Sequence, residues 1–281
     1  MPVKRNCFFF APLRLGVKFI LGDSRKGANE AGSVRMPRGC YNSLLLSDQP
    51  PATAGGSDYM PKRTLRVERM GRVEYATALD LQKQTELAVL TGAQPDTLLL
   101  LEHPHTLTLG RRSPDGGIVA STEVLQKRGV TVFETNRGGK VTYHGLGQIV
   151  GYPIINLSPD REDVHRFVRD LEEVLLRTMN DFQIEAFRIE GLTGVHTARG
   201  KVAAIGVHIA RWVTTHGFAL NVNTDLSYFE LIIACEGEPV TSMQELLGRE
   251  VEMSAVEDRI IEHFAAVFEM CQKPDREGGL S

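Results

Sequence analysis

Residues 162–182 read EDVHRFVRDLEEVLLRTMNDF and carry the clearest structural signal in the chain. Apolar side chains recur there every three or four residues, which is the period of an α-helix with one buried face. Charged residues fill the positions between them. We therefore predict an amphipathic helix at about 162–182. Its buried face comprises Val164, Phe167, Val168, Leu171, Val174, Leu175, Met179 and Phe182.

Before and after this helix in the sequence, short apolar runs alternate with further helical patterns. We expect strands at 65–70, 97–101, 106–109, 131–134, 201–209, 218–222 and 231–234. We expect helices at 73–90, at 121–129 and near the C-terminus, where Ser254 and Glu257 form a capping-box pattern. Helices and strands intermix without a strict repeat. The sequence therefore favours an α/β (α+β) domain with a mixed central sheet flanked by helices.

Residues 1–61 differ from the rest of the chain. They hold eight Lys and Arg against four Asp and Glu, lack periodicity and contain the linker-like run QPPATAGG at 49–56. A disordered extension, a transit peptide and upstream sequence from a wrongly chosen start all fit. We favour the last, with Met60 as the start. We therefore expect a poorly structured extension at 1–61 and one folded domain at 62–281.

The composition excludes several classes of protein. A formal net charge of -3 argues against general nucleic-acid binding, which needs a basic excess. No uncharged apolar run is long enough to cross a bilayer, and the apolar stretch at 8–21 lacks the pattern of a signal peptide. The cysteines form no CxxC pair, so neither a disulfide framework nor a metal site is indicated, and a reducing, cytoplasmic location is expected. They are Cys7, Cys40, Cys235 and Cys271.

A glycine-rich segment is the first candidate for chemistry. Residues 137–148 read RGGKVTYHGLGQ and place four glycines beside cationic, hydroxyl-bearing and imidazole side chains. Glycine lets backbone approach a ligand closely, and polar side chains in such a loop supply donors to a carbonyl or an anion. A tight hairpin with solvated polar residues explains the composition about equally well.

Two apolar segments are the next candidates. Residues 201–209 read KVAAIGVHI, and a lysine that opens an apolar strand is partly desolvated, which suits it to act on a partner. A surface lysine with a buried stem is the commoner explanation. Residues 216–222 read HGFALNV, and this mixture of small and large apolar residues suits the wall of an acyl pocket. It suits ordinary core packing equally well.

Cys235 is the last candidate. It follows an apolar run and precedes Glu236 and a glycine, so it is more accessible than a typical buried cysteine. A reactive cysteine needs a basic neighbour to hold its thiolate. The residue types alone do not show which basic side chain lies beside the Cys235 thiolate. A hydrolase with a Cys/His active site also remains a possible function. The possible partners are Lys201, His144, His208 and His216.

Together these segments resemble the lipoyl(octanoyl) transferase family of the biotin and lipoate protein ligase superfamily. The resemblance rests on RGGKVTYHGLGQ, KVAAIGVHI, WVTTHGFALNV (212–222) and the downstream cysteine, and it extends upstream to LLLLEHPHTLTLGRR (98–112). It covers about the last three quarters of the chain. The set is specific, although no single segment is decisive.

The resemblance implies a ligase-like catalytic domain at 62–281 and an acyltransferase. Such an enzyme carries an octanoyl group from octanoyl-acyl carrier protein, through a cysteine thioester, to a lysine of lipoyl domains. The implied acceptors are 2-oxoacid dehydrogenase complexes and the glycine cleavage H protein. No metal, nucleotide or organic cofactor is implied, because the acyl group arrives already activated.

The resemblance also assigns roles to residues. Cys235 matches the acyl-thioester cysteine, and Lys201 matches the lysine that tunes it and later acts as a base. The sequence departs from the usual family pattern at Leu146, at the residues flanking Cys235 and at His196. The residues implied to bind substrate are Arg137, Gly138, Gly139, Lys140, Val141, Thr142, Tyr143, His144, Ala204, Ile205, Gly206, Gly217, Phe218 and Ala219.

Two alternatives from other classes stay open. An ATP-dependent lipoate–protein ligase would need a nucleotide site and would have no use for Cys235. A non-catalytic relative would only bind acyl groups or lipoyl domains, and the altered residues beside Cys235 keep this alternative in consideration.

Overall fold

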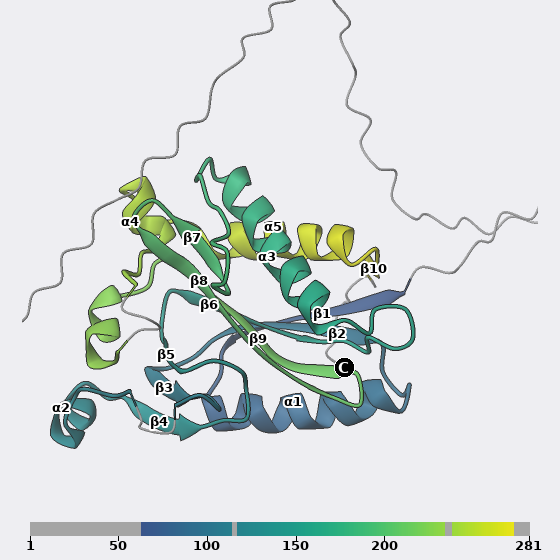
Figure 1. Ribbon diagram of the computed structural model, residues 1–281, viewed down its shortest axis with the longest axis horizontal. Helices are drawn as coiled ribbons and strands as arrows, with labels where there is room; N and C mark the ends of the chain where they lie inside the picture. Colours follow the sequence, from purple (N-terminus) through teal and green to yellow (C-terminus); the bar gives the residue numbers. More distant parts are fainter. Residues whose placement is uncertain (1–62, 114–116, 234–237, 273–281) are drawn as a thin grey trace, which may run out of the picture. The chain divides into compact units, whose positions relative to one another are not determined.

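The larger of two β-sheets forms the centre of the folded domain (Figure 1). The computed structural model describes residues 63–113, 117–233 and 238–272. Within these residues the larger sheet has seven strands in the order β10-β1-β2-β6-β9-β8-β7. Their bounds are β1 (Thr64–Arg72), β2 (Asp96–Glu102), β6 (Gln148–Ile154), β7 (Val195–Thr197), β8 (Gly200–Ala210), β9 (Val213–Asn221) and β10 (Cys271–Gln272).

This sheet is mixed, as predicted. Strand β1 runs parallel to β10 and β2, whereas β2-β6, β6-β9, β9-β8 and β8-β7 are antiparallel pairs. The predicted fold class is thereby confirmed. Residues 1–62 lie outside the described part, so the division of the chain at about residue 61 stays a prediction.

A second, three-stranded sheet carries the glycine-rich segment. It consists of β4 (Thr131–Glu134), β3 (Thr106–Leu109) and β5 (Val141–His144), with β3 between the other two. Strand β5 pairs with β3, while β6, the next strand along the chain, belongs to the larger sheet. The alternative of a tight hairpin for residues 137–148 is therefore wrong.

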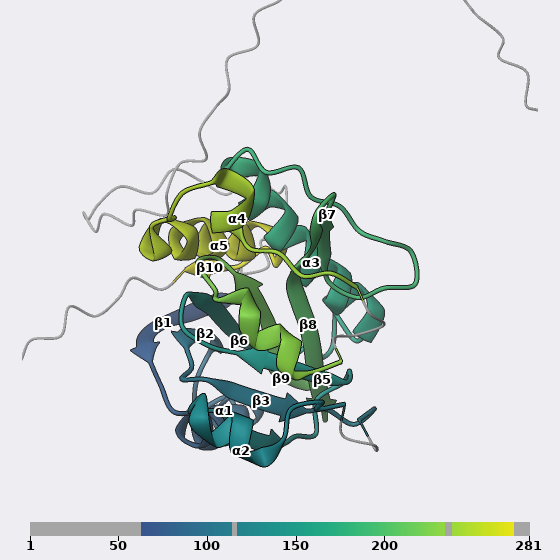
Figure 2. The same ribbon diagram turned by 90° about the vertical axis from the view of Figure 1, so that its left-hand side faces the viewer.

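Helices cover both faces of the larger sheet (Figures 1 and 2). Strand β2 explains why, since successive side chains of a strand point to opposite faces. Leu98 and Leu100 join the core beneath α3 and α5, whereas Leu99 and Leu101 join the core beneath α1. The helices are α1 (Tyr75–Leu90), α2 (Thr122–Lys127), α3 (Val164–Asp181), α4 (Met243–Leu247), α5 (Met253–Val267) and the 3₁₀ helix η1 (Leu226–Leu231).

Helix α3 is the helix predicted at 162–182. It begins after Asp163, whose side chain accepts a hydrogen bond from Arg166 N at 3.0 Å. Phe167, Leu171 and other members of the predicted face are buried, whereas Val164, in the first turn, is exposed. No helix in the described ranges has the length and apolar character needed to cross a bilayer.

Two local predictions are wrong, and one short helix was missed. Ser254 does not cap α5, because that helix already begins at Met253 and the Ser254 hydroxyl donates to Glu252 Oε1. Residues 226–231 form η1 where a strand was expected from 231 onward. Helix α4 was not predicted, although the Ser242 side chain caps it by accepting a hydrogen bond from Glu245 N at 3.2 Å.

Candidate active site

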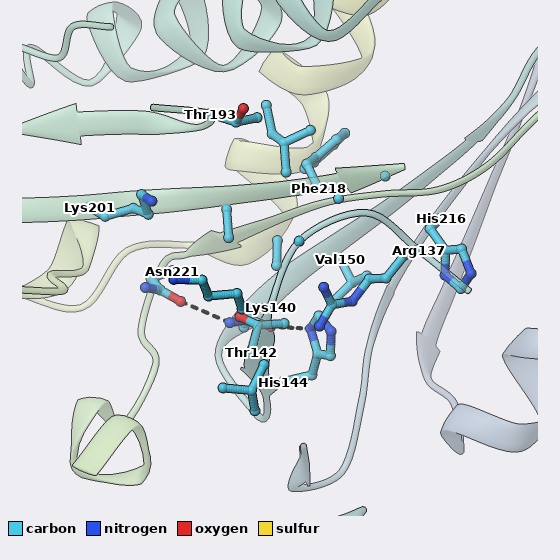
Figure 3. A pocket seen from close by; sticks show the side chains of 18 of the residues that line it. Arg137, Lys140, Thr142, His144, Val150, Thr193, Lys201, His216, Phe218 and Asn221 are labelled. Atoms are coloured by element: carbon cyan, nitrogen blue, oxygen red, sulfur yellow. Dashed lines mark hydrogen bonds between the residues drawn. The ribbon is translucent and has the colours of Figure 1, made fainter. Parts of the chain in front are cut away.

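A pocket opens between two walls of the domain (Figure 3). The loop wall is residues 137–144, and the strand wall is residues 201–206 of β8 with residues 216–221 of β9. The space between them is about 920 Å³, part of it open to solvent.

Most of the residues predicted to bind substrate meet in this pocket, together with Lys201. Gly138 and Tyr143 do not line it, and Cys235 lies outside the described residues. The roles of these residues in binding stay predictions. The predicted residues that line the pocket are Arg137, Gly139, Lys140, Val141, Thr142, His144, Lys201, Ala204, Ile205, Gly206, Gly217, Phe218 and Ala219.

The alternation of β5 explains the position of Tyr143. Thr142 and His144 point to the pocket, so Tyr143 points to the other face of the small sheet. There it is fully buried, stacks on Tyr228 with ring centroids 5.0 Å apart, and shares a hydrogen bond of 2.8 Å with His105. Tyr143 therefore stabilises the loop wall from behind.

Arg137 fixes the start of the loop wall. Its side chain is buried, and its guanidinium donates to Thr108 O at 2.7 Å, to Thr108 Oγ1 at 2.7 Å and to Gly138 O at 3.0 Å. Next to it, Gly138 N donates to Val207 O of β8 at 2.9 Å. This contact needs Gly206, because a Cβ there would lie 2.8 Å from Gly138 O.

Small residues in register form the strand wall. Ala204 of β8 pairs with Ala219 of β9, and Gly206 pairs with Gly217. Side chains of paired residues lie on the same face of a sheet, so these four residues keep one stretch of the strand wall free of large side chains. The neighbouring Phe218 is part of the buried core and also lines the pocket.

Buried histidines near the pocket are neutral. The Nδ1 of His144 donates to Gln148 Oε1 at 2.9 Å, and Gln148 Nε2 donates to Asn221 Oδ1 at 2.9 Å. Burial, helped by the charges of His103 and Arg137, holds the pKa of His144 well below its usual value. His144 is thus a neutral hydrogen-bonding group at physiological pH.

His216 is neutral for the same reason. Its Nε2 donates to Asn136 Oδ1 at 2.8 Å. Burial, followed by the nearby charge of Arg137, lowers the pKa of His216 to about 4. His208 does not line the pocket. Of the four basic partners that the sequence left open for a thiolate, Lys201 is therefore the one that brings a positive charge to this pocket.

Lys201 is not an ordinary surface lysine. Its side chain is only 13% exposed, and its Nζ lies 3.0 Å from Glu238 Oε2. Figure 3 shows Lys201 on the strand wall, with His144 and Arg137 across the pocket. The surface explanation, which is the commoner one for a lone lysine, is wrong here.

Several lining residues were not predicted from the sequence. Gln148 and Asn221 lie inside motifs already quoted, and alternation from His144 and Ala219 would have indicated them. The others come from separate elements and have no local signal. The missed residues are Tyr75, Gln148, Val150, Tyr152, Thr193, Asn221, Phe229, Ile232, Glu238 and Val240.

The fold is that of lipoate-protein ligase catalytic domains. The chain superposes on the bi-partite lipoate protein ligase of Thermoplasma acidophilum with a TM-score of 0.60, covering 76% of this chain and 86% of that one. Their sequence identity is 16%, so this likeness concerns the fold alone.

Sequence comparison is more specific. Residues 74–265 match the family model for the lipoyl protein ligase A/B catalytic domain. A protein of Solibacter usitatus named octanoyltransferase is 48% identical over 213 residues, 75% of this chain and 96% of that relative. An octanoyltransferase of Koribacter versatilis is 48% identical over 211 residues, 73% of this chain and 84% of that relative. The chain belongs to the lipoyl protein ligase A/B family and is an acyltransferase.

Proposed function

We propose that this chain transfers an octanoyl group from octanoyl-acyl carrier protein to a lysine of lipoyl domains, by way of a thioester on Cys235. The observation that carries the proposal is a pocket lined by small residues of β8 and β9 and by a largely buried lysine, in a chain 48% identical to octanoyltransferases. The acceptors we propose are 2-oxoacid dehydrogenase complexes and the glycine cleavage H protein. The scattered spacing of the cysteines, with no CxxC pair, leads us to propose the cytoplasm.

The first half-reaction would form the acyl-enzyme. The Cys235 thiolate attacks the carbonyl carbon of the octanoyl thioester, the carrier's sulfur leaves with the bonding electron pair, and it takes up a proton from solvent. A thiolate needs a nearby positive charge. Lys201 supplies it, since the two buried histidines beside the pocket are neutral.

The second half-reaction would release the product. The amine of the incoming lysine attacks the thioester carbonyl carbon, and the Cys235 sulfur leaves. The attacking nitrogen must lose a proton, and a free lysine with a pKa of about 10.4 needs a base nearby. Acylation has by then removed the thiolate charge. Lys201 releases its own proton to solvent and, as a neutral amine, accepts the proton of the attacking nitrogen.

Two rivals predict different reactants. The fold is shared with ATP-dependent lipoate ligases, so it does not separate transfer from ligation. A ligase would form an adenylate from free octanoate and ATP, and would do so equally well without Cys235. A non-catalytic relative would bind octanoyl carrier or lipoyl domain and produce neither an adduct nor a product.

One experiment separates these functions. The full chain is incubated with octanoyl-acyl carrier protein, and the intact mass and peptide masses are measured. We expect an octanoyl adduct on Cys235 that disappears when a lipoyl domain is added, and no adduct in Cys235→Ser. An adduct on Cys7, Cys40 or Cys271, or transfer by Cys235→Ser at a rate close to that of the wild type, would overturn the proposed mechanism.

A further inference from the structure

One carboxylate binds both Lys201 and a buried histidine at the edge of the pocket. Glu238 Oε2 lies 3.0 Å from Lys201 Nζ and 3.3 Å from His196 Nε2. The three side chains are exposed by only 19%, 13% and 3%, respectively. An ion pair with this degree of burial is screened far less than one on the surface.

Backbone contacts fix Glu238 beside the start of β8. Lys201 N donates to Pro239 O at 2.8 Å, and Thr241 N donates to Lys201 O at 3.0 Å. This approach depends on Gly200, whose φ is +139° and where a Cβ would collide with Pro239 O. The side chains of Glu238 and Lys201 are thus brought together by a parallel bridge, and their pairing does not depend on a flexible surface loop.

His196 orients the carboxylate. It lies on β7, is 2% exposed, and its backbone N and O both bond to Phe187. Burial, followed by the charge of Lys201, lowers the pKa of His196, so it is neutral and carries one ring proton. A carboxylate only accepts hydrogen bonds, so that proton lies on Nε2. The neutral histidine does not neutralise the carboxylate of Glu238, so this carboxylate forms its ion pair with Lys201.

The stem of Lys201 has little room to move. Gly194 lies against it, since a Cβ at Gly194 would be 3.5 Å from Lys201 Cε. The Gly194 backbone is in turn held by Glu172, which is 1% exposed and accepts a hydrogen bond from Gly194 N at 3.0 Å. Without such contacts, a lysine with four rotatable bonds would sample many positions of its ammonium group.

We infer that Glu238, oriented by His196, is a positioning residue that holds the amine of Lys201 at one place on the strand wall. The catalytic consequence of this inference rests on the proposed acyl transfer, whereas the position of Lys201 does not. Removing that carboxylate should leave a more mobile and more reactive amine at position 201.

The first test measures Lys201 itself, without substrate. The full chain is labelled with isotopic acetic anhydride at mildly alkaline pH, and labelling of Lys201 is compared by mass spectrometry with that of exposed Lys83. An amine held in an ion pair reacts slowly, so Glu238→Gln, which frees the Lys201 amine, should raise its relative labelling rate by about tenfold. Glu238→Asp, which keeps the charge, should stay within about threefold of wild type.

A matched control removes a different paired carboxylate. Glu262→Gln breaks an ion pair of 2.6 Å with Arg259 on α5 and should leave Lys201 labelling unchanged. His196→Gln, which keeps a donor at the Nε2 position, should resemble wild type, and His196→Phe should fall between wild type and Glu238→Gln. An unchanged Lys201 labelling rate in folded Glu238→Gln would overturn the inference.

The second test measures catalysis with octanoyl-acyl carrier protein and a lipoyl domain. Glu238→Gln should lower kcat by about tenfold or more, because displaced catalytic groups lose rate steeply, and should leave KM within about twofold. Glu238→Asp should recover part of kcat. A normal kcat in Glu238→Gln despite faster labelling would remove the positioning role. If wild type itself transfers no octanoate, the proposed function fails, and the labelling result still decides the state of Lys201.

Discussion

Each wall of the pocket carries a largely buried cation, and the two cations are used differently. On the loop wall, Arg137 donates to backbone and hydroxyl oxygens of Thr108 and Gly138. On the strand wall, Lys201 pairs with the carboxylate of Glu238. A guanidinium stays protonated in proteins and binds several oxygens at fixed angles, whereas an ammonium can lose its proton. From this comparison we propose a role in stability for Arg137 and a role in proton transfer for Lys201.

The largest expected effect concerns Lys201. Lys201→Ala should lower kcat/KM for octanoyl transfer by about 10²–10⁴-fold, the usual contribution of a positioned acid or base. Because the variant leaves the largely buried carboxylate of Glu238 without this partner, the free energy of unfolding in urea should fall by about 1–3 kcal/mol. Steady-state kinetics and equilibrium unfolding are measured on the same preparations.

Lys201→Arg sharpens this prediction. Arginine keeps the positive charge and cannot act as a base. The variant should therefore still form the octanoyl adduct in a mass measurement, while transfer to a lipoyl domain should fail. Equal rates for both half-reactions in this variant would mean that Lys201 serves as a charge only.

The reverse pattern is expected for Arg137. Arg137→Met removes the donors that satisfy Thr108 O, Thr108 Oγ1 and Gly138 O, leaving buried acceptors without these bonds. Loss of several such bonds should lower the free energy of unfolding by about 2–4 kcal/mol. Arg166→Met, at an exposed arginine of α3, should cost no more than about 0.5 kcal/mol. A variant at Arg137 that lost activity at full stability would contradict the assignment of this residue to the fold.

The buried histidines and the ion pair between Lys201 and Glu238 should respond differently to a fall in pH. His216 titrates near pKa 6.5 in the unfolded chain and at about 4 in the folded one, because burial disfavours its charged form. The unfolded chain then binds more protons between these values, so stability is full above pH 6.5 and is lost as pH falls. Between pH 6.5 and about 5 this histidine should cost about 2 kcal/mol.

The measurement is urea unfolding at several pH values. His216→Gln should flatten the pH dependence, and His165→Gln, at an exposed position of α3, should not. The pKa of Glu238 behaves differently: burial raises it, but hydrogen bonding and the charge of Lys201 outweigh burial and hold it below its usual value. The ion pair on the strand wall should therefore persist at a pH where the histidines already destabilise the fold.

The sequence predicted the elements well and the partners of side chains poorly. Local periodicity was enough for α3 and for the strand at 201–209, because one buried face leaves a regular pattern. It was not enough to show that β5 pairs with β3, since pairing joins segments distant in sequence. From the sequence alone, Lys201 and three histidines were equally suitable partners of a thiolate. Burial keeps the histidines beside the pocket neutral, and burial depends on the whole fold, so local sequence did not show this difference.

The smallest expected effect distinguishes two positions that the sequence treated as equivalent. Ala204 and Gly206 both line the strand wall, so enlarging either residue was expected to shorten the acyl slot. The structure separates them. A side chain at Gly206 must displace Gly138 O, which a Cβ would approach to 2.8 Å, so Gly206→Ala should loosen the loop wall and slow transfer of every chain length alike. Ala204 already carries a Cβ and lines the pocket, so Ala204→Leu adds its carbons to the pocket side.

Each methylene that no longer fits forfeits about 0.8 kcal/mol of burial, or roughly fourfold in kcat/KM. Ala204→Leu should therefore move the preference from octanoyl toward hexanoyl or shorter groups by roughly that factor for each displaced methylene. The two variants and the wild type compete for an equimolar mixture of hexanoyl, octanoyl and decanoyl carrier proteins, and the products are counted by mass. If both variants change the length profile in the same way, the loop wall adapts to a side chain at Gly206, and the rigid contact between Gly138 and β8 does not hold in solution. If neither changes it, the acyl chain does not lie along the strand wall.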